Sequence, residues 1–424
     1  MNIYRAQDDK LVLVGFLEGN AVDVTFSYSG EYLASDDAAA LSISLPLQHE
    51  PFSNRECSPY FRGLLPEGAA LGTVSNRIVA SDAPYIEILA SHGLDCIGDI
   101  VINADAFDVP ADYERMSMSD IDKLAVSLLE IHRSLSEARL SLAGSQYKVG
   151  LYHDDDVAFD EGWFQPVGGA PSNYIVKFPR ADLPDLLIIE QLCLGAARAC
   201  GLPVPDSGLI ALDQPVFFMK RFDRQILSSR LVGSVHPPIR RHQEDLAQAL
   251  GVLPEDKYLE LIPSSAAAIA SLIRERSDSP LEDVGLFASW LCFNYLVGNC
   301  DNHLKNISLL YDENLRGMRL APFYDIASTT YFGERFSHEM GMRIGNTVEI
   351  DDVDAGDFEE LRKQLGISKR MLSTLAKSIA DRFYGGLNAE AEKLEKTGIS
   401  GASYIGDNLA EDASARMPVL STLI

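Results

Sequence analysis

Residues 297–311 read VGNCDNHLKNISLLY, and this stretch decides how the chain is interpreted. An apolar run ends there in Gly-Asn-Cys, and an Asp, a His, a Lys and two Asn follow before the chain turns apolar again. The apolar run Val284–Gly298 is too short to span a bilayer comfortably and predicts a buried helix. The sequence therefore predicts a loop with much polar chemistry between two buried elements.

The composition is that of a globular, acidic protein. The 424 residues are 46% hydrophobic, enough for two or three domains with a sizeable core. The net charge of −26 at pH 7 repels phosphate backbones, so we expect contact with DNA mainly through a basic partner protein. The first residues lack the architecture of a signal peptide, and no membrane segment is expected, which predicts a cytoplasmic protein.

The six cysteines form no Cys-x-x-Cys pair, which argues against a zinc site. Most lie in apolar runs and are expected to be reduced core residues. They are Cys57, Cys96, Cys193, Cys200, Cys292 and Cys300.

Three parts follow one another along the chain. Residues 1–135 alternate at first between polar and apolar, which predicts a small antiparallel sheet over 1–50 and then an α+β unit with helices over 58–92 and 117–135. Residues 136–235 suggest a β-rich unit with a hairpin from QYKVGLYHDD and VAFDEGWFQP. Residues 236–424 are mostly helical in pattern, starting with HQEDLAQALG. A β-rich part before a helical part with an acidic loop suits phosphoryl transfer.

The polar loop within residues 297–311 contains the groups that phosphoryl transfer requires. Asp301 and Asn306 are five residues apart, as a base and a metal ligand would be. Asp325, in LAPFYDIAS, is expected at a strand end as the main magnesium ligand, returned to Asn306 by a hairpin. His303 and Lys305 would shape the loop or contact phosphate. A plain turn remains an alternative for the loop, as does metal-dependent hydrolysis by Asp301, His303 and Asp325.

Lys177 and Glu190 are candidates for an ion pair at the nucleotide phosphates. Lys177 lies in the apolar strand NYIVKFP (173–179), where a buried lysine is costly unless paired. Glu190 lies in an apolar stretch of the following helix, predicted over 182–201. Each residue alone could be a side chain that reaches the surface, but together they match the lysine and glutamate pair of kinases.

Two further segments are candidates for nucleotide contact. FFMKRFDR (217–224) follows a strand and could be a hinge, with Met219, Lys220 and Phe222 near the adenine edge. The alternative is a plain edge strand. RLSLAGSQYK (139–148) has a Gly-Ser pair before a strand, where backbone amides could cradle phosphates.

In this combination the chain resembles the HipA family, serine/threonine-protein kinase toxins of bacterial toxin–antitoxin systems. The motifs that carry the resemblance follow one another in the family's order over nearly the whole chain. They are LSISLPLQ (41–48), YFRGLLPEG (60–68), SLAGSQYK (141–148), YIVKFP (174–179), GLPVPD (201–206), KRFDR (220–224), HQEDLAQALG (242–251), GNCDNHLKNISLL (298–310) and APFYDIAS (321–328).

The resemblance implies a fold and roles for the site residues. The fold would be α+β and protein-kinase-like, with a β-rich N-terminal lobe that carries an added small α+β subdomain, and a helical C-terminal lobe. Asp301 would be catalytic, Asn306 and Asp325 magnesium ligands, and Lys177 the ligand of the ATP phosphates. Ser141 would be a regulatory autophosphorylated serine, whose added charge disfavours ATP. The phosphate loop would contain Ala143, Gly144, Ser145, Gln146 and Lys148.

The resemblance also implies partners. A HipB-like helix-turn-helix antitoxin would neutralise the toxin and hold it on operator DNA for autorepression. The kinase would use ATP and Mg²⁺ to phosphorylate a cellular protein, with an aminoacyl-tRNA synthetase as one candidate, and so cause growth arrest and persistence. Two other functions stay open: a catalytically weak corepressor, and a small-molecule phosphotransferase, which the first ~135 residues fit poorly.

Overall fold

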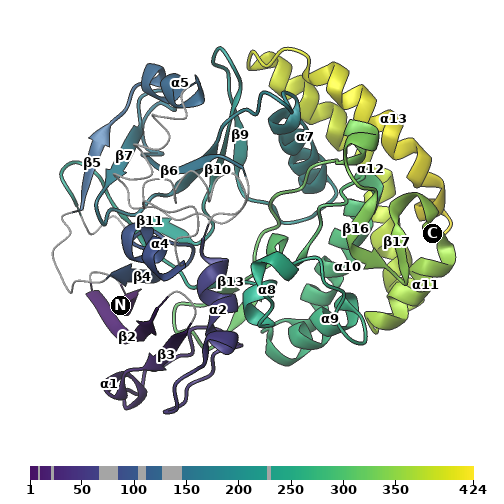
Figure 1. Cartoon of the computed structure of the whole chain (residues 1–424). Coiled ribbons are helices and arrows are strands. Elements are labelled where there is room, and N and C mark those ends of the chain that lie inside the picture. The colour runs from purple at the N-terminus through teal and green to yellow at the C-terminus, as the bar shows by residue number, and fades with distance from the viewer. Residues whose placement is uncertain (8–9, 21–22, 66–84, 104–110, 127–145, 227–230) are drawn as a thin grey trace. The chain divides into compact units, whose positions relative to one another are not determined.

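The computed structural model describes residues 1–424 except 8–9, 21–22, 66–84, 104–110, 127–145 and 227–230. Its contacts divide the chain into two compact units. Unit 1 comprises Met1–Phe178, Leu212–Pro254 and Leu310–Arg316, and is rich in strands (Figure 1). Unit 2 comprises Pro179–Ala211, Glu255–Leu309 and Gly317–Ile424, and is rich in helices.

The first sheet of unit 1 is antiparallel and has the strand order β3-β2-β1-β4. Buried and partly buried residues alternate along β3 because successive side chains point to opposite faces. Helix α2 packs on β3, where Phe26 and Phe61 have ring centroids 5.4 Å apart. The antiparallel sheet predicted for residues 1–50 is thus confirmed. Its elements are β1 (Asn2–Gln7), β2 (Lys10–Gly19), β3 (Val24–Tyr28), β4 (Ile100–Asn103) and α2 (Asn54–Gly63).

The second sheet of unit 1 contains strands in the order β5-β7-β6-β8-β10, each antiparallel to its neighbour. The predicted hairpin is β6–β7, in which Tyr152 lies opposite Phe164. Trp163, Val176 and Phe217 are fully buried, so these strands contribute to the core of the unit. The strands are β5 (Asp112–Arg115), β6 (Lys148–His153), β7 (Trp163–Val167), β8 (Tyr174–Lys177) and β10 (Val216–Lys220).

The helix expected from HQEDLAQALG is shorter than predicted. Residues Gln243–Asp245 form strand β13, and helix α8 runs only from Leu246 to Ala249. The reason is capping at both ends: the Asp245 carboxylate accepts the Gln248 N–H at 2.8 Å, and the chain turns away at Gly251, whose φ is +66°. Unit 1 also contains α1 (Gly30–Leu33), α4 (Tyr85–His92), α5 (Met118–Val126), β11 (Arg224–Ile226) and β12 (Pro238–Arg240).

Helix α10, Pro280–Val297, is the predicted buried helix and contacts α9, α12 and α13 of unit 2. Phe287, Trp290 and Phe293 are fully buried, as expected of a helix that is apolar all round. Pro280 begins the helix, where its missing N–H costs no hydrogen bond. The helix therefore gives the loop that follows it a rigid base.

Helix α7, Leu186–Ala199, packs closely on α12, and the chain leaves it at Gly201, as predicted. A Cβ at Gly386 of α12 would lie 2.4 Å from the Cβ of Ala199, so only glycine permits this approach. The other elements of unit 2 are β9 (Ser207–Ile210), α9 (Ser265–Arg276), η2 (Leu304–Asn306), β15 (Met318–Leu320), η3 (Thr330–Arg335), β16 (Glu339–Ile344), β17 (Thr347–Glu349), η4 (Ile350–Asp352), α11 (Ala355–Gln364), α12 (Lys369–Lys396) and α13 (Ala402–Ser421). Two elements span the unit boundaries, η1 (Pro254–Asp256) and β14 (Ser308–Tyr311).

All six cysteines are buried and unbridged, which confirms the prediction of reduced core residues. Within the part of the chain that the structure describes, no helix is both long and apolar enough to cross a membrane. The predicted helices over 58–92 and 117–135 are present as α2, α4 and α5, with residues 66–84 and 127–135 outside the described ranges. The domain boundaries after residues 135 and 235 stay predictions.

Candidate active site

The loop after α10 is fixed to the end of that helix. Gly298 ends the helix with a left-handed φ of +74°, and its carbonyl accepts the N–H of Thr330 at 3.1 Å. A Cβ at Gly298 would lie 1.9 Å from Thr330 Oγ1, so no other residue fits. The Asn299 side chain then accepts the N–H of Asp301 at 3.0 Å and donates to the Asn294 side chain at 2.6 Å. These contacts hold Asp301 in place from its backbone.

The carboxylate of Asp301 points to the surface of unit 2, with its side chain 55% exposed. His303 Nε2 lies 3.8 Å from Asp301 Oδ1, and the His303 side chain is buried. Oδ1 of Asp301 also accepts a hydrogen bond from the hydroxyl of Tyr258. Asp301 is thus an accessible carboxylate on a rigid backbone, which is what a base that receives a proton from a bound hydroxyl requires.

Asn306 and Lys305 lie in the short 3₁₀ helix η2 and are buried. The Asn306 side-chain amide donates to the backbone carbonyl of Asp301, with 2.8 Å between Nδ2 and O. The Asn306 Oδ1 is therefore the atom of this side chain that can bind a cation. Lys305 contributes its backbone carbonyl, which accepts the hydroxyl of Tyr324 at 2.9 Å.

Asp325 follows Tyr324 and is half-buried. The predicted hairpin is present as β14 and β15, which are neighbours in one sheet. The Ala321 N–H donates a hydrogen bond to the backbone carbonyl of Ser308 at 2.8 Å. We predicted Asp325 at the end of a strand, and this prediction is wrong. Strand β15 ends at Leu320, and Asp325 lies beyond it in an irregular segment. Its φ is +51°, a left-handed value uncommon for residues other than glycine.

The donors on this loop fit magnesium better than a metallohydrolase centre. Asn306 Oδ1 and the Asp325 carboxylate are hard oxygen ligands, and the Tyr324–Lys305 hydrogen bond ties their two segments together. Among the described residues, no three His, Cys, Asp or Glu side chains form a group that could hold a metal ion. Asp301, His303 and Asp325 therefore do not form the three-ligand centre considered as an alternative.

Lys177 lies in strand β8 of unit 1 and is buried. It is directly opposite Lys148 of β6 on one side and Phe217 of β10 on the other, and its Nζ is 5.3 Å from the Phe217 ring centroid. Like charges directly opposite one another on a sheet are destabilising. The neighbouring Gln146 side chain donates to the Phe178 carbonyl at 3.3 Å.

The predicted hinge lies at the end of β10 in unit 1. Met219 is buried, and Lys220 forms an ion pair with Asp155 at the surface. Phe222 is half-buried in the turn that follows. The contact of these residues with an adenine ring stays a prediction.

Glu190 is buried in α7 of unit 2. Its proposed ion pair with Lys177 would join the two units, so it also stays a prediction. Ser141, Ala143, Gly144 and Ser145 lie outside the described residues, so their predicted roles are not tested.

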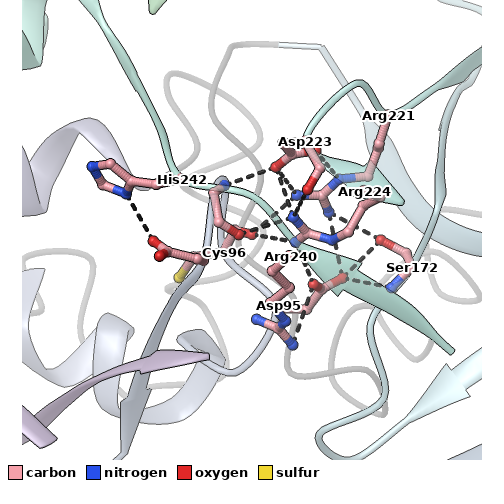
Figure 2. Close-up of polar contacts among 10 residues, drawn as sticks. Asp95, Cys96, Ser172, Arg221, Asp223, Arg224, Arg240 and His242 are labelled. Carbon is pink, nitrogen blue, oxygen red and sulfur yellow. Dashed lines mark hydrogen bonds and ion pairs between the residues drawn. The ribbon is translucent and has the colours of Figure 1, made fainter. Parts of the chain in front are cut away.

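Sequence reasoning missed a buried ion network in unit 1, shown in Figure 2. Arg221 and Arg224, from the segment interpreted as a hinge, both bind Asp223 at 2.8 Å, and Arg224 binds Asp95 at 2.8 Å. Arg240 lies 3.5 Å from Asp95. Burial alone would raise the pKa of Asp95, but the arginines more than offset it and hold that pKa well below its usual value. Only the density of charge in KRFDR pointed to such a network.

Tyr258 was also missed, because it lies 43 residues before Asp301 in the chain and belongs to no motif. The one clue is its place in KYLELIPSS, where several large apolar residues occur in a segment without helical or strand periodicity.

Comparison with known proteins gives the family. The model of the HipA N-terminal domain matches residues 10–103, and that of the HipA-like C-terminal domain matches residues 140–386. The protein named "Putative kinase Y4mE" of Sinorhizobium fredii is 33% identical over 393 residues, which cover 88% of this chain and 89% of that protein. Serine/threonine-protein kinase toxin HipA of Shewanella oneidensis is 25% identical over 398 residues, covering 88% of this chain and 85% of the toxin.

A solved structure of Shewanella oneidensis HipA, in complex with HipB and operator DNA, superimposes with a TM-score of 0.80 and 22% sequence identity. The match covers 99% of both chains. This likeness confirms the predicted α+β, kinase-like fold. The chain therefore belongs to the HipA family, and it carries the N-terminal and C-terminal domains of that family in order.

Proposed function

We propose that the protein is an ATP-dependent serine/threonine protein kinase. The observation that carries the proposal is the geometry of one loop. The Asn306 amide is bound to the backbone of Asp301, while the Asp301 carboxylate is accessible and Asn306 Oδ1 is left for a cation. This arrangement supports the proposal, because phosphoryl transfer requires a base and a metal ligand close together on a rigid support.

In the proposed reaction the acceptor hydroxyl gives its proton to the Asp301 carboxylate as its oxygen bonds to the γ-phosphorus. The bond from phosphorus to the bridging oxygen breaks, and ADP leaves with that oxygen. Mg²⁺, when bound by Asn306 and Asp325, would neutralise charge on the phosphates. Lys177, with Lys148 opposite, would bind the nucleotide phosphates, and Glu190 would orient Lys177. His303, whose Nε2 lies 3.8 Å from Asp301 Oδ1, would orient Asp301, and Lys305 would support the loop through its backbone carbonyl.

The test is phosphoryl transfer from labelled ATP, in the presence of Mg²⁺, by the wild type and by Asp301→Asn. We expect the substitution to abolish labelling, because the amide cannot accept the proton. Asp36→Asn, an exposed site in unit 1, is the matched control and should label as the wild type does. Equal labelling by Asp301→Asn would remove Asp301 from the mechanism.

We also propose that the kinase is the toxin of a type II toxin–antitoxin system, with a HipB-like helix-turn-helix antitoxin as partner and operator DNA bound mainly through it. The family membership supports this role, and so does the net charge of −26, which suits a basic DNA-binding partner. An antitoxin gene next to this one, whose product restores growth when co-expressed, is expected. The target would be a cytoplasmic protein, with an aminoacyl-tRNA synthetase as one candidate, and phosphoproteomics after induction would identify it.

Autophosphorylation of Ser141 is proposed as a regulatory step. A phosphate there would add about −1.5 to −2 charges beside the phosphate loop and disfavour ATP. Peptide mapping of the wild type after incubation with ATP and Mg²⁺ should find phosphate at Ser141, whereas Asp301→Asn should carry none. An unmodified Ser141 in active wild-type protein would contradict this step.

A catalytically weak corepressor is the second candidate, favoured by the same acidic charge. Repression of a reporter under the system's own operator and binding of ATP, measured together, separate the two functions, because only the kinase is expected to bind nucleotide. If the protein is mainly a corepressor, Asp301→Asn will repress as well as the wild type, and the wild type will show no affinity for nucleotide.

A further inference from the structure

The hydroxyl of Tyr258 donates a hydrogen bond to Oδ1 of Asp301. Both residues belong to unit 2. We propose that Tyr258 is a gate on the acceptor side of the active site: its hydroxyl occupies the position that an acceptor hydroxyl takes, and the acceptor must displace it. This inference rests on the proposed kinase function, in which Asp301 is the base.

The chemistry of the two hydroxyls explains the competition. A base in this reaction accepts one O–H donor from a serine or threonine side chain. The phenol of Tyr258 presents the same donor to the same carboxylate oxygen. While that hydrogen bond is formed, the Tyr258 hydroxyl takes one lone-pair direction of Oδ1, and an acceptor hydroxyl that approaches along this direction must displace it.

Several contacts hold the Tyr258 ring in this position. The ring meets the ring of His303 edge-on, with centroids 5.1 Å apart and an angle of 80°. The Lys257 ammonium lies 5.3 Å from the Tyr258 ring centroid. The Lys257 carbonyl accepts the Leu304 N–H at 3.3 Å, which ties this segment to the catalytic loop. A Cβ at Gly341 would lie 3.1 Å from Cδ1 of Tyr258, so the ring fits closely against the strand beneath it.

The same side chain can leave without opening the core. Tyr258 is 51% exposed, and its neighbours Leu259 and Ile262 are 57% and 95% exposed. Displacing the ring therefore costs the hydrogen bond to Asp301 and the ring's contacts with His303 and Gly341, and it leaves the core intact. A protein acceptor that covers Leu259 and Ile262 would gain apolar burial at the moment it moves Tyr258. Only an acceptor protein that binds the segment from Tyr258 to Ile262 would then reach Asp301.

The test compares steady-state phosphorylation of a serine/threonine peptide library by the wild type, Tyr258→Phe and Tyr258→Ala, with labelled ATP. Removal of the competing hydroxyl should lower KM for the peptides about three- to ten-fold, the size of one hydrogen bond, and change kcat by less than about two-fold. The matched control is Tyr404→Phe, another tyrosine on the surface of unit 2, which should behave as the wild type. Thermal melting of each variant would show that it is folded.

The outcomes separate this inference from the proposed function. An active wild type with an unchanged or higher KM in both Tyr258 variants would overturn the gate and leave the kinase assignment intact. Phosphate found on Tyr258 by mass spectrometry would also overturn it, because the hydroxyl would then be an acceptor. A wild type that transfers no phosphate to any peptide, to itself or to proteins of a cell lysate would overturn the kinase function and the gate with it.

Discussion

The side chain of Asn306 binds the backbone of Asp301, with 2.8 Å between the Asn306 Nδ2 and the Asp301 carbonyl oxygen. The bond closes a loop of six residues, so it fixes the distance between the proposed base and the proposed metal ligand. It also fixes the orientation of the Asn306 amide, because only the NH₂ end can donate. One side chain thus sets both the shape of the loop and the oxygen available to a cation.

Replacement of Asn306 should separate these two effects. We expect Asn306→Ala to reduce kcat by at least about 100-fold, since it removes the donor and the oxygen ligand together. Asn306→Asp keeps oxygen ligands and loses the donor, so excess Mg²⁺ should restore part of its activity and none of that of Asn306→Ala. Asn388→Ala, at an exposed position of α12, is the control. Equal Mg²⁺ dependence in both variants would contradict a ligand role for Asn306.

Lys177 and Lys148 should differ in their importance for nucleotide binding. Lys177 is buried between two strands, whereas Lys148, directly opposite, is half-buried at the start of β6. Lys177→Met should lower the affinity for ATP by about 100-fold and Lys148→Met by about 10-fold, because a buried charge–phosphate contact is screened less by water. Displacement of a fluorescent ATP analogue by ATP would measure both affinities. Lys10→Met, on an exposed position of β2, should have no effect. A larger effect of Lys148 than of Lys177 would contradict the assignment.

Asp95 should make the stability of the protein sensitive to acid. Its pKa and that of Asp223 are lowered in the folded state, because the surrounding arginines outweigh the effect of burial. Their contribution is therefore complete above the unfolded pKa of about 4 and is lost as the pH falls further. Asp95→Asn should destabilise the protein by about 3–5 kcal/mol at pH 7 in urea unfolding, since it removes one of the two carboxylates that neutralise three buried arginine side chains.

The pH dependence provides the check on that substitution. The difference in urea midpoint between wild type and Asp95→Asn should shrink on going from pH 7 to pH 3. The difference for the exposed control Asp36→Asn should stay near zero at both. A constant difference for Asp95→Asn would mean that packing, and not charge, explains its effect.

The cysteines should be unreactive in the native protein. Burial raises the pKa of every cysteine thiol, to about 11 for Cys57 and Cys300 and to about 12 for the other four. Because the thiolate is the nucleophile, alkylation at pH 8 should be at least about 100-fold slower than in guanidinium chloride. Labelling followed by mass spectrometry would measure each site. Rapid native labelling of Cys300, next to Asp301, would contradict the burial of that thiol.

Local sequence patterns predicted the helix and the hairpin that flank the candidate site. The length of the apolar run before Asp301 favoured a buried helix over a membrane span, and the stretch ISLLYDENLRGMRLAPF predicted the hairpin after Asn306. The left-handed backbone of Asp325 could not be predicted, because nothing in PFYDI demands it. The same holds for Tyr258, whose contact with Asp301 depends on how two segments meet in the fold. KRFDR was interpreted as a hinge because the sequence does not show that Asp95 lies beside it.

The ion network around Asp95 bears on how this chain could be shortened or recombined. Asp95 and the carbonyl of Cys96 come from the part matched by the N-terminal family model, whereas Arg221, Arg224 and Arg240 come from the part matched by the C-terminal model. A truncated chain that began near residue 140 would keep the three guanidinium groups and lose one of their two carboxylates. The two family domains are therefore not interchangeable modules, and a chimaera between relatives should fold only if both halves of this network come from compatible parents.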